Sequence, residues 1–122
     1  MQPLALVFYE KLLPGSQLVN RLQDLSYRVQ TVHDPALLLA AVRREMPMLL
    51  LADLAARADL TRVIAELKAD PATAHIPVIA FAEEKALTHL AAAQQAGAAL
   101  AVSETALMSY LPQLLNQALH IE

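Results

Sequence analysis

One short apolar segment constrains the fold of this chain more than any other. Residues 48–52 are all apolar, do not alternate with polar residues, and are followed directly by Asp53. A run of this kind is typical of a strand that is buried on both faces of a parallel sheet. Asp53 is then expected just beyond the carboxyl end of the strand, at the edge where open α/β folds place their sites. The alternative is that Asp53 only ends a strand and begins a loop.

Four other segments predict strands, and helical patterns separate them. Mainly apolar runs occupy residues 4–8, 75–81 and 98–102, and the alternating segment 27–32 is typical of a more exposed, edge strand. Apolar residues at helical spacing predict helices over about 15–25, 34–46, 59–70, 85–96 and 109–120. Strands that alternate with helices in this way predict an α/β fold. Right-handed crossovers then make the strands parallel and place helices on both faces of the sheet, in a three-layer (βα)5 architecture.

Local signals predict where several helices begin and end. Asp34, followed by proline, can accept hydrogen bonds from the free amides of the second helix. Asp59 or Thr61 is expected to cap the third helix, and Gly97 is a natural stop for the fourth. Proline is tolerated only in the first turn of a helix, so the last helix is expected to begin shortly before Pro112.

The composition excludes several classes of protein. A chain of 122 residues with 57% apolar composition can bury one compact core, and we expect a single domain over residues 1–122. There are no cysteines, which excludes disulfides and thiolate metal sites. The formal charge of −3 argues against a nucleic-acid partner. No apolar run approaches the length of a membrane span, and no signal segment opens the chain, so a cytoplasmic protein without a membrane partner is expected.

Enzyme chemistry is also not expected. The four histidines lie on separate predicted elements with no pair four residues apart, which disfavours a histidine metal site. The chain has no Gly-rich phosphate loop, serine elbow or nucleophile–base pair. A small-molecule or enzymatic use of the predicted sheet edge is the weakest of the alternatives.

The predicted strand ends bring a set of mainly acidic residues together. Parallel strands end at one edge of the sheet, and the residues that follow them are Tyr9 and Glu10, Asp53, Ala82 and Glu83, and Ser103 and Glu104. Carboxylates that share an edge raise one another's proton affinity or attract a hard cation such as Mg²⁺. The alternative is that the glutamates face water or lie at helix starts.

Over essentially its whole length, the chain resembles the receiver domain of response regulators, the phosphoacceptor module of two-component signalling. Three stretches carry the resemblance: residues 47–54 around Asp53, residues 76–79 in the fourth strand, and residues 96–98 before the fifth. The resemblance implies a flavodoxin-like fold with strand order 2-1-3-4-5 and the phosphoacceptor position for Asp53. It further implies Mg²⁺ held by Glu10 and Asp53. The implied partners are proteins, such as a histidine kinase or an output domain, bound through the fourth helix, fifth strand and fifth helix.

Three positions depart from the receiver pattern. Tyr9 replaces the first of two adjacent acids, Ala82 stands where the family has a hydroxyl residue, and Glu104 stands where it has a lysine. Phosphoryl transfer needs cations around the oxygens, and a unit charge pair about 4 Å apart is worth about 4 kcal/mol at an effective dielectric near 20. We therefore expect an atypical receiver, or pseudo-receiver, that needs no cofactor, docks a protein partner and is phosphorylated weakly or not at all.

The sequence is compatible with two further possibilities. The alternative function is a working phosphoacceptor in which Glu10 and Asp53 still hold Mg²⁺. The resemblance also leaves open a homodimer that forms through a helical face. The residues alone do not choose between these possibilities, because no local pattern reports on the surroundings of Asp53 or on the surface of the folded chain.

Overall fold

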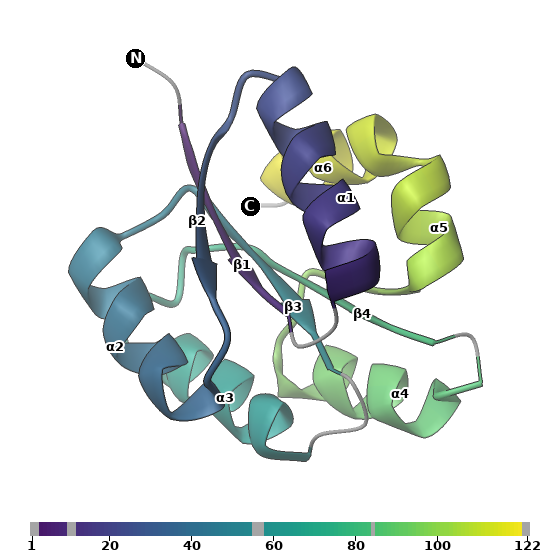
Figure 1. The fold of residues 1–122 in the computed structure, drawn as a ribbon. Coiled ribbons are helices and arrows are strands. Elements are labelled where there is room, and N and C mark those ends of the chain that lie inside the picture. Colours follow the sequence, from purple (N-terminus) through teal and green to yellow (C-terminus); the bar gives the residue numbers. More distant parts are fainter. Residues whose placement is uncertain (1–2, 10–11, 55–57, 84, 121–122) are drawn as a thin grey trace.

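The computed structural model describes residues 3–9, 12–54, 58–83 and 85–120 (Figure 1). The strands are β1 Leu4–Phe8, β2 Arg28–Val32, β3 Leu49–Asp53, β4 Val78–Ala82 and β5 Leu100–Ser103. The helices are α1 Leu12–Asp24, α2 Pro35–Glu45, α3 Ala58–Ala69, α4 Leu87–Ala96, α5 Glu104–Ser109 and α6 Leu111–His120. Strands and helices therefore alternate along the chain up to β5, as the apolar periodicity predicts.

All five strands are parallel and lie in the order β2-β1-β3-β4-β5. Every residue of β1, β3 and β4 is buried, because each of these strands has a neighbour on both sides and helices over both faces. The edge strand β2 is only partly buried, with Arg28 and Thr31 exposed, which agrees with its alternating sequence. The predicted (βα)5 flavodoxin-like architecture and strand order are confirmed.

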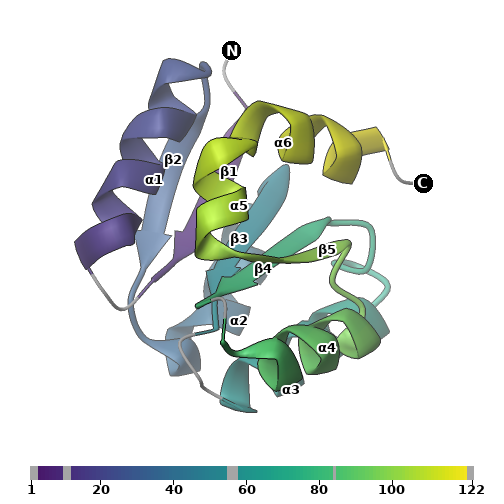
Figure 2. The ribbon, with the colours of Figure 1, turned by 90° about the vertical axis from the view of Figure 1, so that its right-hand side faces the viewer.

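The two faces of the sheet have separate cores (Figures 1 and 2). Successive strand residues point to opposite faces, so Leu6 and Phe8 of β1 pack under α2, α3 and α4, whereas Ala5 and Val7 pack under α1, α5 and α6. Figure 2 shows α5 and α6 beside α1 on one side of the sheet, with α3 and α4 below on the other. This alternation decides which side chains can meet at the ends of the strands.

Two of the predicted helix ends are confirmed and two are wrong. Asp34 caps α2, because its Oδ1 accepts from the backbone N–H of Ala36 at 2.9 Å, and Gly97 ends α4 with φ 117°. α3 begins at Ala58, so neither Asp59 nor Thr61 is its cap. α1 begins about one turn earlier than expected, at residue 12, because proline at its third position lies in the first turn and does not interrupt it.

The last helical segment is split in two, which the sequence pattern did not predict. Ser103 caps α5 by accepting from the N–H of Ala106 at 3.1 Å, and the helix ends at Tyr110 before α6 begins. The break has a covalent cause. In a continuous helix the carbonyl of Met108 accepts from the N–H four residues later, and that residue is Pro112, which has none. The helix start expected near Pro112 is therefore α6, and α5 is an additional helix before it.

Candidate functional site

Asp53 is the last residue of β3 and lies at the carboxyl edge of the sheet. Only 2% of its surface is exposed, and it is one of two buried polar residues in the described part of the chain. Most loops that follow parallel strands are solvated, so a nearly complete burial of this carboxylate needs a structural cause.

Asp53 stands in a row of aromatic residues at the end of the sheet. The strand register places Phe81 of β4 directly opposite Asp53, and the β1–β3 register, continued by one residue, places Tyr9 on the other side. By the two-residue alternation of β3, Asp53 shares a sheet face with Leu51, whose core lies under α1, α5 and α6. Phe81 belongs to that core and is fully buried, and Tyr9 packs against it. Two aromatic residues therefore flank the carboxylate within the sheet.

Tyr9 is held from the next strand. Its backbone N–H donates to the carbonyl of Val32 at 3.3 Å, and its own carbonyl accepts from Nδ1 of His33 at 3.1 Å. The rings of Tyr9 and His33 meet edge to face with their centroids 4.6 Å apart. These contacts connect the ends of β1 and β2, so Tyr9 has a defined place beside Asp53.

The ends of β4 and β5 bring Ala82 and Ser103 opposite one another. Ala82 is buried, with 1% of its surface exposed, and it supplies no hydrogen-bond donor. The hydroxyl of Ser103 serves the N-terminus of α5, and Glu104 is half-buried in the first turn of that helix. Negative charge is favourable at this place because of the free amides and the helix dipole. For Glu104, the structure therefore agrees with the alternative of a residue at a helix start.

A magnesium site is not assembled by the described residues. In the described ranges, no group of three or more His, Asp or Glu side chains lies close enough together to hold a metal ion. Mg²⁺ prefers an octahedron of oxygen ligands, and Asp53 alone cannot supply it. Glu10 lies outside the described residues, so the predicted Glu10–Asp53 pair stays a prediction. No helix that the structure describes has the length and apolar character needed to cross a bilayer.

At the opposite, amino edge of the sheet, a cavity of about 510 Å³ is lined mainly by small residues together with Lys68 and His75. Nζ of Lys68 donates to the carbonyls of Ala74 and Ile76 at 3.1 and 2.7 Å, and burial lowers the pKa of this ammonium group. The lysine is thus occupied in holding the loop between α3 and β4. Sequence reasoning missed this role, because nothing near residue 68 signals which carbonyls the folded loop presents.

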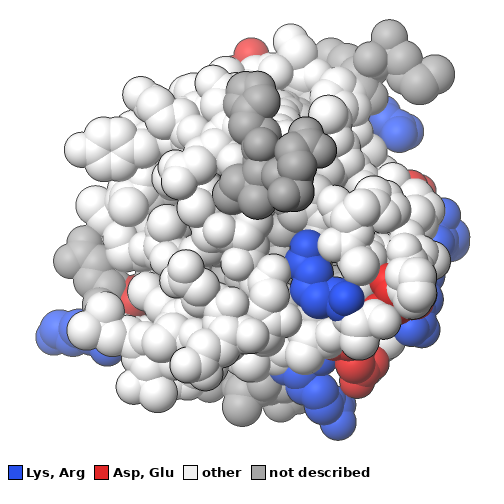
Figure 3. Space-filling view, turned by 180° about the vertical axis from the view of Figure 1, so that it is seen from behind, with Lys and Arg blue, Asp and Glu red and all other residues white. Residues whose placement is uncertain are grey.

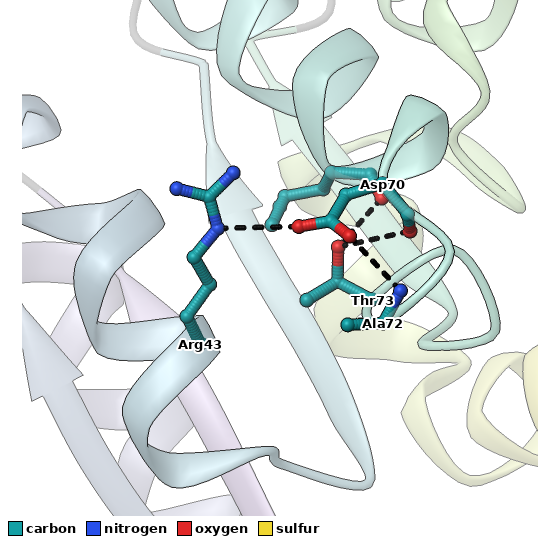
Figure 4. Close-up of polar contacts among 5 residues, drawn as sticks. Arg43, Asp70, Ala72 and Thr73 are labelled. Atoms are coloured by element: carbon teal, nitrogen blue, oxygen red, sulfur yellow. Dashed lines mark hydrogen bonds and ion pairs between the residues drawn. The ribbon is translucent and has the colours of Figure 1, made fainter.

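A second polar contact, also at the amino edge, joins α2 to the same loop (Figure 4). Nε of Arg43 lies 3.3 Å from Oδ2 of Asp70, whose Oδ1 accepts from the N–H of Ala72 at 3.0 Å. Next to them, the buried hydroxyl of Thr73 donates to a carbonyl at the end of α3 at 2.7 Å. Arg43 lies in the last turn of α2, where a positive charge complements the helix dipole. The structure shows that it also fixes the position of a neighbouring loop.

Comparison with known proteins gives a fold but no close relative. No family model and no curated protein sequence matches the chain. The receiver domain of NtrX from Brucella abortus matches with a TM-score of 0.84 and 19% identity over 97% of this chain and 99% of that one. The receiver domain of the sensor histidine kinase PA1611 from Pseudomonas aeruginosa PAO1, solved with a magnesium ion coordinated in its active site cleft, matches with a TM-score of 0.83 and 18% identity over 99% and 100% of the two chains.

A longer NtrX structure from the same organism matches with a TM-score of 0.83 and 20% identity. The match covers 98% of this chain, which spans only 27% of that protein. Identities of 20% or less establish the three-dimensional arrangement and not the activity. On these matches and its strand order, the chain has the fold of the response-regulator receiver domain.

Proposed function

We propose that this chain is a pseudo-receiver, which acts in signal transduction by docking a protein partner, with phosphorylation of Asp53 weak or absent. The observation that carries the proposal is the burial of Asp53, which is 2% exposed between Tyr9 and Phe81. A phosphoryl donor has to approach a carboxylate oxygen in line with its leaving group. A carboxylate enclosed in the sheet in this way restricts that approach.

The neighbouring strand ends support the same proposal. Transfer of a phosphoryl group needs positive charge and hydrogen-bond donors around its oxygens, and removal of one such donor typically costs about 10²–10³ in rate. Ala82 offers no donor. Glu104, in place of a lysine, brings a negative charge to the end of β5. Together they make this edge of the sheet unfavourable for a phosphoryl group.

The alternative function is a working phosphoacceptor that uses Asp53 with Mg²⁺ held by Glu10 and Asp53. It draws on a receiver domain of the same fold that holds a magnesium ion in its active site cleft. Both functions take residues 1–122 as one domain that catalyses no reaction on a separate substrate. Both also imply a cytoplasmic signalling partner, such as a histidine kinase or an output domain.

Acetyl phosphate with MgCl₂ separates the two functions. We expect the wild-type protein to show no mass increase of one phosphoryl group, and the Asp53→Asn variant gives the background. The double variant Ala82→Thr, Glu104→Lys restores a hydroxyl and a cation, and its labelling rate should exceed that of the wild type by about 10² or more. Near-stoichiometric, Mg²⁺-dependent labelling of wild-type Asp53 would overturn the pseudo-receiver proposal and favour the phosphoacceptor.

A further inference from the structure

The cavity at the amino edge of the sheet has the size and the walls of a small-molecule site, and we call it the amino-edge cavity. Its volume of about 510 Å³ lies within the range of about 300–1,000 Å³ that is usual for ligand pockets. Three segments that are distant in the sequence form it: the loop between α3 and β4, the turn from α4 into β5, and α6. Small side chains make up its apolar wall, namely Ala74, Pro77, Ala98, Ala99 and Ala118.

Lys68 brings the only formal charge to the described residues that line the amino-edge cavity. The carboxyl-terminal segments of the wall bring none, because Glu104 is the only Asp, Glu, Lys or Arg between residues 86 and 120. Glu104 follows β5 and therefore lies at the opposite edge of the sheet. Figure 3 shows the consequence: charged side chains gather in the right half of the view, whereas most of the left half, over α4 to α6, is uncharged. An anion in the cavity thus meets one positive charge and no acidic side chain of this lining.

The ammonium group of Lys68 has one hydrogen-bond donor to spare. Two of its three N–H groups donate to carbonyls of the adjoining loop, at 3.1 and 2.7 Å, and the third has no partner among the residues that the structure describes. None of the ion pairs within the described ranges includes Lys68, and Asp70, two residues further on, pairs with Arg43. Burial lowers the pKa of Lys68, as expected for an ammonium group without a carboxylate beside it. A carboxylate from outside the chain can supply that missing charge.

Gly97 and His75 complete the polar side of the cavity. A Cβ at position 97 would lie 2.6 Å from Cγ of Lys68, so the glycine leaves the space that the stem of the lysine occupies. Both residues line the cavity, and the stem is therefore held at its wall. His75 is an exposed residue of the same lining, and its imidazole can donate a further hydrogen bond to a ligand.

The hydrogen-bond donors at this edge fit a carboxylate better than a phosphate group. Phosphate sites in proteins are commonly formed by several free N–H groups at the start of a helix. α3 and α4 end at this edge instead, and the N–H groups of residues 97–99 all donate to carbonyls of the chain. The negative ends of the two helix dipoles also oppose a doubly charged ligand. One ammonium group therefore matches a ligand with a single negative charge.

We propose that the amino-edge cavity binds a small monocarboxylate with an apolar body. Its carboxylate accepts from the third N–H of Lys68 and from His75, and its apolar part lies against the alanines of the turn into β5 and of α6. A ligand held in this way connects the loop between α3 and β4 with α6. The site rests on the fold and lies at the opposite edge from Asp53, so it and the docking role proposed above can fail independently.

Titration of the whole ¹⁵N-labelled chain with sodium hexanoate tests the site, with amide chemical shifts recorded by NMR. We expect saturable shifts centred on residues 74–76, 97–99 and 118. The dissociation constant should be about 1 mM, because so small a ligand makes few contacts. Hexan-1-ol has the same apolar body without the charge and should bind at least about tenfold more weakly. Inorganic phosphate should also bind at least about tenfold more weakly, because the cavity offers it too few donors.

Variants of the lining test where the ligand lies. Lys68→Met should raise the dissociation constant for hexanoate at least about tenfold. Lys85→Met is the matched control, because it removes the same charge from an exposed residue at the other edge of the sheet, and it should leave the constant unchanged. Ala74→Leu fills the cavity and keeps the ammonium group, so it should weaken binding as well. The amide spectrum of each variant confirms that the fold is retained.

Three results would overturn the proposal. The first is an absence of saturable shifts at hexanoate concentrations up to about 20 mM. The second is binding of hexan-1-ol or phosphate as tight as that of hexanoate, because the cavity would then not select a monocarboxylate. The third is an affinity for hexanoate that Lys68→Met and Ala74→Leu both leave unchanged, because the ligand would then lie elsewhere on the protein.

Discussion

The guanidinium of Arg21 replaces a hydrogen bond that Pro112 removes from the last helical segment. Met108 lies four residues before Pro112, so its carbonyl lacks the usual donor four residues later, and Nη1 of Arg21 donates to it at 3.1 Å from α1. We predict that Arg21→Met destabilises the protein. The methionine retains most of the aliphatic length of the side chain, so the change removes chiefly the hydrogen bond.

The magnitude follows from the type of bond and its burial. A hydrogen bond to a charged group contributes about 1.5–3 kcal/mol, and the lower end applies because this bond is only partly buried. We expect the free energy of unfolding to fall by about 1–2 kcal/mol. At about 2.1 cal/mol/K of unfolding entropy per residue, this corresponds to a fall in Tm of about 4–8 °C for a chain of this size.

A double-mutant cycle, with unfolding measured in urea, tests both the size of this loss of stability and its proposed cause. Pro112→Ala supplies a backbone N–H that can reach the carbonyl of Met108, so Arg21→Met should cost less than about 0.5 kcal/mol in that background. The coupling energy is then about 1 kcal/mol or more. Arg44→Met is the control, because Arg44 is an exposed residue with a local ion pair at 2.8 Å, and it should cost under about 0.5 kcal/mol. An equal cost of Arg21→Met in both backgrounds would refute the reasoning.

Three further predictions concern local features. Gly97→Ala should lower the free energy of unfolding by about 2 kcal/mol, measured in urea, because φ is 117° and a Cβ would lie 2.6 Å from Cγ of Lys68; no loss would show that the backbone relaxes. Lys68→Met should cost about 1–2 kcal/mol through its two hydrogen bonds to carbonyls. Burial lowers the Lys68 pKa in the folded state, so at high pH the unfolded chain binds one more proton than the folded protein. The stability of the wild type relative to this variant, measured by thermal unfolding, should therefore rise as the pH approaches the ordinary lysine value of 10.5. A decrease in this relative stability would contradict the predicted sign. Asp34→Ala should cost about 1 kcal/mol by removing the cap of α2, whereas Asp34→Asn should retain most of it.

Local patterns in the sequence determine the architecture of this protein. Apolar runs without alternation occur only where strands are covered on both faces, so they predict β1, β3 and β4, and the alternating segment predicts the edge strand β2. Capping by Asp34 and termination at Gly97 follow equally from local chemistry, because these residues act on backbone groups within a few positions of themselves. The predicted starts of α1 and α3 were wrong. Near these starts, several neighbouring polar residues or a proline are each compatible with the first turn of a helix, so the local pattern does not select one of them.

The sequence also places Asp53 at the carboxyl edge of the sheet and shows that Ala82 and Glu104 follow the neighbouring strands. Only the tertiary structure decides how that carboxylate is surrounded, because Tyr9 and Phe81 reach it through the strand register and not through sequence proximity. The same holds for Arg21, which donates to the carbonyl of Met108, 87 positions away in the sequence. Hydrogen bonding and burial depend on distances in space, and a linear pattern fixes these only within one element. The fold could therefore be predicted from periodicity, whereas the enclosure of Asp53 required the packed sheet.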